Sequence, residues 1–228
     1  MLSMQSVSKT YELRGRKITA LDNVTIEIPR GDFVCIVGSS GSGKSTLLLM
    51  LGGMLSPATG SVLVDGQSLY DLTSDQRSLV RKKKIGFVFQ TFNLVPYLTA
   101  LENVQVPLLL ADWNKSEQGK RAVSLLERLG LGDRIDHKPS ELSIGQQQRV
   151  ALARMLANDP PFIFADEPTG NLDPATAESV LGFFEEMNRE GRTIVMVTHD
   201  IRAGRVARRT LRLMDGRILN GDEKASDS

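Results

Sequence analysis

A glycine-rich loop between an apolar strand and an apolar helix is the feature that most constrains this chain. Residues 33–37 read FVCIV, which has the length of a strand, and residues 38–45 read GSSGSGKS, which fits the pattern G-x-x-x-x-G-K-[ST]. An apolar helical pattern begins near Lys44. In this order the three elements predict a loop whose backbone N–H groups and helix N-terminus surround phosphate oxygens. The alternative is a flexible Gly/Ser linker that happens to contain a lysine, and the flanking strand and helix argue against it.

The loop therefore predicts a site for a nucleoside triphosphate, with ATP and Mg²⁺ as the cofactors. We expect Lys44 to reach the β- and γ-phosphates and the Ser45 hydroxyl to contact Mg²⁺. The nucleotide-binding residues predicted from this stretch are Gly38, Ser39, Ser40, Gly41, Ser42, Gly43, Lys44, Ser45 and Thr46.

Two adjacent carboxylates follow a second apolar strand. Residues 162–165 read FIFA, and Asp166 and Glu167 come directly after them. In open α/β sheets ligands bind at the carboxyl ends of the strands, where such residues lie. We expect Asp166 to hold Mg²⁺ and Glu167 to orient or deprotonate the attacking water. A pair of acidic residues in a surface loop is the alternative, which a phosphate-binding loop in the same chain disfavours.

The hydrophobic pattern predicts an α/β fold of the P-loop NTPase type. Its sheet is mostly parallel, with an N-terminal antiparallel β subdomain and an inserted α-helical subdomain. We expect one domain over the 228 residues, with a nucleotide-binding core (about 1–90 and 158–220), a helical subdomain (about 91–157) and a disordered tail (221–228). Expected strands are 61–64, 85–89, 162–165, 193–197 and 210–214, and expected helices are 74–84, 116–129, 143–156, 174–189 and a segment after Asp200.

Composition excludes several other classes of protein. The formal net charge is +1, so no overall field favours binding of nucleic acid. Cys35 is the only cysteine, so an internal disulfide is excluded and a small core residue is expected. The uncharged stretches 45–64 and 85–101 contain glycine, proline or amide residues, so neither predicts a membrane span. The first residues show no basic-then-apolar pattern of a signal peptide.

Leu142-Ser143-Ile144-Gly145-Gln146, followed by Gln147-Gln148-Arg149, resembles the signature motif of ATP-binding cassette (ABC) ATPases. It lies upstream of the strand that delivers Asp166, as that family requires, and the resemblance extends over nearly the whole chain. Residues 167–173 (EPTGNLD) and 99–110 (TALENVQVPLLL) are most similar to cassettes of the lipoprotein-releasing and macrolide-exporting class.

The resemblance implies roles for further residues. Tyr11 lies where the family has an adenine-stacking aromatic residue, and Gln90 matches a glutamine that contacts Mg²⁺. Asp173 belongs to the family's D-loop, and His199 matches its switch histidine, which donates to the γ-phosphate. The catalytic residues are then Glu167, His199 and Gln90, and the metal ligands Ser45, Gln90 and Asp166. Ser143, Gly145, Gln146 and Asp173 join the nucleotide-binding set.

The signature also has a local physical interpretation. Ser143 and Gln146 have the spacing of a capping box, so a helix should begin here and offer its N-terminus to an anion. The glycine loop of the same chain is already expected to hold one phosphate group. The resemblance therefore implies that the N-terminus of the signature helix meets the ATP of a second subunit in a head-to-tail homodimer. Ile144 stands where the family usually has glycine. Because isoleucine is a β-branched residue, we expect a negative φ there.

We therefore predict an ATP-hydrolysing subunit that powers a separately encoded membrane permease by closure of the dimer. It is expected to be cytoplasmic and peripheral on the inner face of the membrane. The alternative is a non-transporting cassette that acts as a switch on a membrane complex, such as a cell-division or envelope regulator. A DNA-repair cassette is disfavoured because the chain is short, and a phosphate-loop kinase because Ser143–Gln146 is present.

Overall fold

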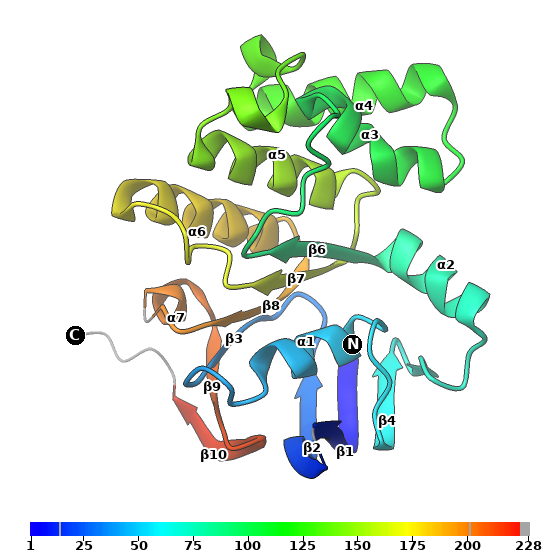
Figure 1. Cartoon of the computed structure of the whole chain (residues 1–228), viewed down its shortest axis with the longest axis vertical. Coiled ribbons are helices and arrows are strands. Elements are labelled where there is room, and N and C mark those ends of the chain that lie inside the picture. Colours follow the sequence, from blue (N-terminus) through cyan, green and yellow to red (C-terminus); the bar gives the residue numbers. More distant parts are fainter. Residues whose placement is uncertain (14, 201, 224–228) are drawn as a thin grey trace.

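The computed structural model describes residues 1–13, 15–200 and 202–223 (Figure 1). The strands are β1 (Leu2–Leu13), β2 (Arg16–Ile28), β3 (Phe33–Val37), β4 (Thr59–Val64), β5 (Gln67–Ser68), β6 (Ile85–Phe89), β7 (Phe162–Asp166), β8 (Thr193–Thr198), β9 (Arg209–Met214) and β10 (Arg217–Glu223). The helices are α1 (Lys44–Leu51), α2 (Ser74–Lys84), α3 (Ala100–Leu110), α4 (Lys115–Arg128), α5 (Ile144–Leu156), α6 (Pro174–Arg189) and α7 (Ala203–Val206), with 3-10 turns at Gly132–Arg134 and Pro139–Glu141.

A six-stranded sheet in the order β10-β9-β3-β8-β7-β6 forms the centre of the protein. Its pairs β9–β3, β3–β8, β8–β7 and β7–β6 are parallel, and only β10 runs antiparallel to its neighbour. The register places Val37 opposite Thr198, and Asp166 opposite both Val197 and Phe89. Since parallel strands end at one edge, the residues that follow β3, β6, β7 and β8 emerge side by side. The predicted fold class is confirmed.

The central strands are buried on both faces, which is why they read as continuous apolar runs. In β3, Phe33 and Cys35 join the core under α5 and α6, whereas Val34 and Ile36 join the core around α1 and the antiparallel sheet. Strand β7 alternates in the same way. A shift of such a strand by one residue would move every side chain to the opposite face of the sheet and so into the other core. The register of the sheet is therefore strongly specified.

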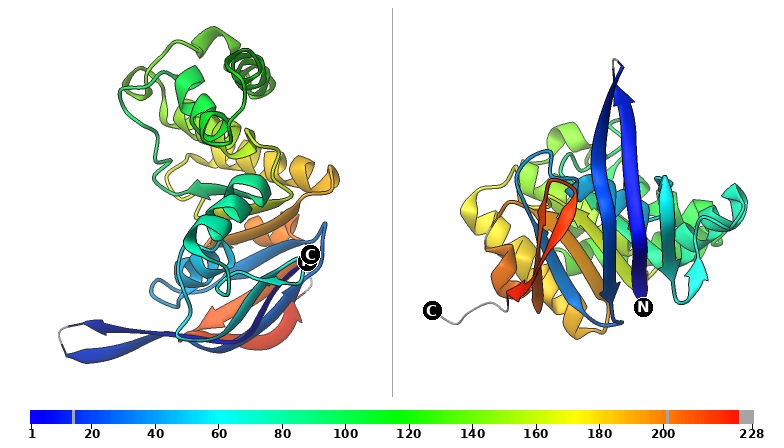
Figure 2. Two further views of the ribbon diagram at one scale, coloured as in Figure 1. Left: turned by 90° about the vertical axis from the view of Figure 1, so that its right-hand side faces the viewer. Right: turned by 90° about the horizontal axis from the view of Figure 1, so that it is seen from below.

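The N-terminal residues form the predicted antiparallel sheet, in the order β2-β1-β4-β5. Leu2, Met4, Val24, Ile26 and Ile28 are buried in the period-two pattern that the sequence predicts. Register shifts beyond Met4 mark irregular pairing between β1 and β2. The far end of this hairpin projects from the rest of the molecule (Figure 2).

Helices α3, α4 and α5 pack on one another at the end of the molecule opposite the antiparallel sheet (Figure 1). Capping boxes begin two of them, Thr99 with Glu102 and Ser143 with Gln146, as the sequence predicts. We propose that residues 91–157 form the helical subdomain and that the remainder forms the core. Among the described residues no helix has the length and apolarity needed to cross a membrane.

Element boundaries differ from the predicted ones where tertiary pairing extends a strand. Strand β4 begins at Thr59 rather than Ser61 because residues from Thr59 pair with β1, and β8 and β9 are each one residue longer than expected. Helix α7 is a single turn. Strand β10 reaches Glu223, two residues beyond the point where the tail is expected to begin, and residues 224–228 lie outside the described residues.

Candidate functional site

The glycine loop after β3 has positions that no side chain can occupy. A Cβ on Gly38 would lie 2.3 Å from the carbonyl oxygen of Leu213, and one on Gly43 would lie 2.2 Å from that of Ala20. Gly43 also has φ 105°, a conformation that other residues rarely adopt. At these two glycines the loop thus packs directly against the backbone of β9 and β2.

The N-terminus of α1 has no side-chain cap. Helices α2 to α6 each begin at a residue whose side chain accepts a backbone N–H, namely Thr73, Thr99, Asn114, Ser143 and Asp173. The N-cap of α1 is Gly43, which has no side chain to form such a hydrogen bond. Its first N–H groups and its positive dipole end are therefore available to an anion. An uncapped helix N-terminus can bind a phosphate group, so this geometry agrees with the predicted ATP site.

Lys44 and Ser45 lie at this helix start and contact residues far along the chain. The Lys44 ammonium is buried and donates to the carbonyl oxygens of Gly38 (2.8 Å) and Ser39 (3.1 Å). The Ser45 hydroxyl donates to Oδ1 of Asp166 at 3.1 Å, across 121 residues of sequence. A hydroxyl and a carboxylate so placed suit Mg²⁺, which takes few protein oxygens and completes its shell with phosphate and water.

Burial raises the pKa of the Asp166 carboxyl above its ordinary value. The neighbouring charge of Glu167 acts in the same direction, and the hydrogen bond from Ser45 and the charge of Lys44 oppose it. A carboxylate whose charged form is disfavoured in this way gains from a nearby cation. The electrostatics therefore fit a bound divalent ion beside Asp166.

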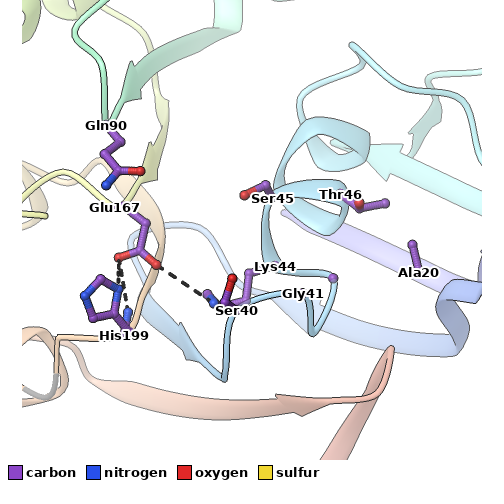
Figure 3. A pocket seen from close by; sticks show the side chains of 10 residues that line it. Ala20, Ser40, Gly41, Lys44, Ser45, Thr46, Gln90, Glu167 and His199 are labelled. Atoms are coloured by element: carbon purple, nitrogen blue, oxygen red, sulfur yellow. Dashed lines mark hydrogen bonds and ion pairs between the residues drawn. The ribbon is translucent and has the colours of Figure 1, made fainter.

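The carboxylate of Glu167 is held by groups from the end of β8 (Figure 3). Its Oε2 accepts from the Thr198 hydroxyl (2.9 Å) and from the His199 backbone N–H (3.2 Å), and it lies 2.9 Å from His199 Nδ1. Its Oε1 lies 3.9 Å from the Lys44 ammonium. Glu167 has φ 47°, which is unusual for a residue other than glycine. Such backbone strain concentrates at functional sites.

A cavity of about 580 Å³ lies between the glycine loop and the carboxyl ends of the central strands. Gln90, Glu167 and His199 face the glycine-loop residues across it (Figure 3). It is lined by Ala20, Ser40, Gly41, Gly43, Lys44, Ser45, Thr46, Gln90, Glu167 and His199. The sheet register thus brings together the predicted loop, the three predicted catalytic residues and, through Ser45, the predicted ligand Asp166.

Tyr11 does not line this cavity. It lies on β1 opposite Ile18 near the projecting end of the hairpin, with its side chain 39% exposed and the Lys9 ammonium 5.6 Å from its ring. The exposed ring leaves a face for stacking, and its contact with adenine remains a proposal.

A second hollow of about 710 Å³ lies at the start of α5, and of the predicted signature residues Gln146 does not line it. Ser143, Ile144 and Gly145 line it together with Asp173 and Thr176. The Asp173 carboxylate caps α6 by accepting from the N–H groups of Ala175 and Thr176, and the Thr176 hydroxyl donates to it at 2.5 Å. These hydrogen bonds lower the pKa of Asp173. The signature and Asp173 are thus together, and none of these residues lines the first cavity.

Ser143 is the N-cap of α5, and Ile144 is its first helical residue. The Ser143 hydroxyl accepts from the Gln146 N–H (3.2 Å), and the Gln146 side chain accepts from the Ser143 N–H (2.9 Å). Ile144 is absent from the residues with positive φ, and its side chain is 55% exposed. The prediction of an ordinary negative φ at Ile144 is confirmed.

We expect Ile144→Gly to leave the rate of ATP hydrolysis within roughly tenfold of wild type, or about 1.4 kcal/mol in activation free energy. The reason is that the cap geometry depends on Ser143 and Gln146 and needs no glycine at 144. Steady-state release of phosphate from both proteins at equal concentration measures the ratio. A change of a hundredfold would show that the Ile144 side chain itself takes part.

Two contributors to the site carry no sequence signal of their own, and a third lies in the signature-like stretch without a predicted role. Ala20 lines the cavity because its backbone packs on Gly43, Thr198 orients Glu167, and Gln148 contacts the residue after Glu167. Each is a common residue type within an ordinary strand or helix. These three residues belong to the site only because distant segments of the chain pack together there.

Comparison with known proteins supports the same assignment of fold. A family model described as "ABC transporter" matches residues 21–170. An uncharacterised ABC transporter ATP-binding protein of Thermotoga maritima is 48% identical over 218 residues, which cover 96% of this chain and 93% of that protein. The macrolide export ATP-binding/permease protein MacB of Syntrophobacter fumaroxidans is 49% identical, and the match covers 96% of this chain but 31% of that protein.

The similarity extends to solved structures. The dimeric structure of the cassette MJ0796 in a post-hydrolysis state bound to ADP and Pi matches with a TM-score of 0.92 and 44% identity, over 100% of both chains. The organism of MJ0796 is Methanocaldococcus jannaschii. This chain thus spans about a third of the macrolide exporters that it resembles and nearly all of the separate cassettes.

Proposed function

Because this chain belongs to the ABC transporter family, we propose that it is the ATP-binding and ATP-hydrolysing part of a transporter and that it drives a membrane permease. The observation that carries the proposal is the cavity in which an uncapped helix N-terminus and Lys44 face Glu167, Gln90 and His199. It combines a phosphate site with a carboxylate aimed at the same space.

The chain's own residues divide the work of the site among them. Bound ATP supplies the phosphoryl group, and Mg²⁺ supplies positive charge beside it. The N–H groups of the glycine loop and Lys44 would bind the phosphates, and Ser45, Asp166 and the Gln90 amide oxygen would hold the cation. Glu167 accepts a proton from water, because its carboxylate faces the cavity. His199, whose ring is 69% exposed, donates to the γ-phosphate once it leaves Glu167.

The second hollow supports a head-to-tail dimer. The start of α5 and Asp173 lie apart from the first cavity, so within one chain the signature has no phosphate beside it. A two-fold partner would bring its own α5 N-terminus to the first cavity, and symmetry would complete two sites at once. In this proposal each ATP lies between the glycine loop of one subunit and the signature of the other.

A groove of about 440 Å³ between α2, β6 and α3 is the proposed docking site for the permease. Apolar side chains such as Val106, Leu110 and Met155 line it. Its charged lining residues among those described are Arg81, Lys82 and Arg154, and burial lowers the pKa of Arg154. Apolar walls with cations and no facing carboxylate suit a permease segment that carries acidic residues on an otherwise apolar face.

We expect Leu110→Asp to weaken binding of the permease at least tenfold, or about 1.4 kcal/mol, because it removes apolar surface from this groove and adds an anion that would repel an acidic partner segment. Turnover of the isolated chain should stay within twofold of wild type. Leu109→Asp is the matched control, since the Leu109 side chain is exposed but does not line the groove. Co-purification with the detergent-solubilised membrane partner measures binding, and equal loss in both variants would place the permease elsewhere.

Two measurements test the proposed function as a whole. Purified protein should hydrolyse ATP with a requirement for Mg²⁺, and Lys44→Ala should remove that activity. Reconstitution with the captured membrane partner should then give ATP-dependent movement of a substrate across vesicles. Hydrolysis without any transport by the complete complex would favour the alternative of a switch on a membrane complex.

A further inference from the structure

Gln148 is a fully buried amide in α5 that contacts the loop after the candidate catalytic base. Its exposed fraction is 0%, and its Nε2 donates to the carbonyl oxygen of Pro168 at 2.9 Å. Pro168 directly follows Glu167. The Oε1 of Gln148 is buried and has no hydrogen-bond partner among the described residues.

The loop that begins at Glu167 depends on outside contacts for its shape. Glu167 has φ 47°, and its N–H donates to Val197 at 2.9 Å. Its carbonyl oxygen accepts from the Gly170 N–H at 3.1 Å, so the chain turns sharply at this point. A residue held at such a φ persists only where its surroundings determine the conformation. The hydrogen bond from Gln148 holds the next carbonyl in the turn.

Residues from three separate segments of the chain form hydrogen bonds with this loop. The Asn171 amide donates to the carbonyl oxygen of Gln90 at 3.1 Å, and the Thr169 hydroxyl donates to Asp200 at 3.1 Å. Gln148 supplies the contact from α5, the helix whose N-cap is Ser143. The loop ends at Asp173 in the second hollow. Gln148 therefore joins the signature helix to a loop that starts at the first cavity and ends at the second.

Packing alone does not favour a glutamine at this position. A buried amide with one unmet acceptor is less favourable than an apolar side chain of equal length, and such an exception in a folded protein calls for a functional explanation. The glutamine side chain supplies the N–H donor that the carbonyl oxygen of Pro168 accepts.

We propose that Gln148 is a positioning residue for ATP hydrolysis: its amide fixes the backbone beside Glu167 and so aims the carboxylate into the cavity. The proposal rests on the proposed function, in which Glu167 is the general base. Gln148 does not line the cavity and need not touch ATP. Its loss should therefore slow the chemical step without weakening nucleotide binding.

Gln148→Met tests this assignment, because methionine keeps the length and removes the donor. We expect kcat for ATP hydrolysis to fall ten- to a hundredfold, roughly the effect of a misplaced catalytic group. The KM and the affinity for ATP should stay within twofold of wild type. Gln147→Met is the matched control, since Gln147 lies on the same helix and its amide donates to the carbonyl oxygen of Leu142 at 3.1 Å instead of to that of Pro168. Its kcat should stay close to that of wild type.

A second variant and a second measurement keep the test decisive. If Gln148→Met does not fold, Gln148→Asn retains the amide but draws the donor back from Pro168, and its kcat should also fall. Amide hydrogen exchange of residues 169–171 should be faster in the Gln148 variants than in Gln147→Met. Hydrogen exchange reports how easily the loop opens and does not require ATPase activity. A wild-type protein without ATPase activity would contradict the proposed function and not the role of Gln148 in holding the loop.

A kcat for Gln148→Met equal to that of Gln147→Met would overturn the assignment. A matching rise in KM would also overturn it, because Gln148 would then act in binding. Unchanged exchange in residues 169–171 would show that the hydrogen bond does not hold the loop.

Discussion

Replacement of Glu167 by glutamine should abolish most ATP turnover and leave ATP binding intact. The carboxylate faces the cavity, and its Oε1 lies 3.9 Å from the ammonium of Lys44. Glutamine has the same shape but cannot accept a proton from water. We expect a loss of the order of 10²–10⁴-fold in kcat, the contribution of a positioned general base.

The measurement combines release of phosphate with binding of ATP and gel filtration. Because closure is proposed to need ATP and reopening to need hydrolysis, Glu167→Gln should also accumulate as an ATP-bound dimer. Glu185→Gln is the control, since Glu185 forms a surface ion pair with Arg189 on α6 and should leave turnover unchanged. Normal turnover in Glu167→Gln would remove Glu167 from the mechanism.

Mixing two inactive variants should restore ATPase activity. Ser143→Arg places a bulky cation at the start of α5, in the hollow that is proposed to meet the partner's ATP, and Lys44→Ala removes the lysine of the glycine loop. A mixed dimer pairs the intact glycine loop of the first variant with the intact signature of the second. Random pairing in a symmetric dimer limits the recovered rate to about a quarter of wild type if the sites act independently.

Each variant alone should be inactive, and the rate of the mixture should depend on the proportion of the two. Ser116→Arg controls for an added arginine at an exposed serine near the start of another helix, α4, and should be active alone. Full activity of Ser143→Arg by itself would contradict a site shared between subunits, and no recovery in a correctly folded mixture would count against it too.

The sequence alone determined those features that depend on neighbours in the chain. The glycine loop needs a strand before it and a helix after it, and both are visible in residues 33–51. Capping boxes at Thr99 and Ser143 depend on a partner three residues away. The negative φ of Ile144 follows from β-branching at one residue. These interactions have short range, so composition and spacing specify them.

Only the tertiary structure decided which distant residues meet. The hydrogen bond from Ser45 to Asp166 and the pair of Glu167 with His199 exist because strands β3, β7 and β8 end at one edge in a fixed register. From the sequence, these residues were predicted only by the family resemblance or by the rule that ligands bind at the carboxyl ends of parallel strands. Packing on both faces of the sheet sets that register, which no local pattern encodes.

The same reason explains what sequence analysis missed or could not place. Tyr11 lies in a predicted strand, opposite Ile18, and is not among the residues that line the cavity, so its stacking on adenine stays a prediction. Gln148 lies in a predicted helix, but its partner Pro168 is 20 residues along the chain. The residue types and local conformations were thus determined by the sequence, and the contacts between segments by the burial of apolar faces that brings those segments together.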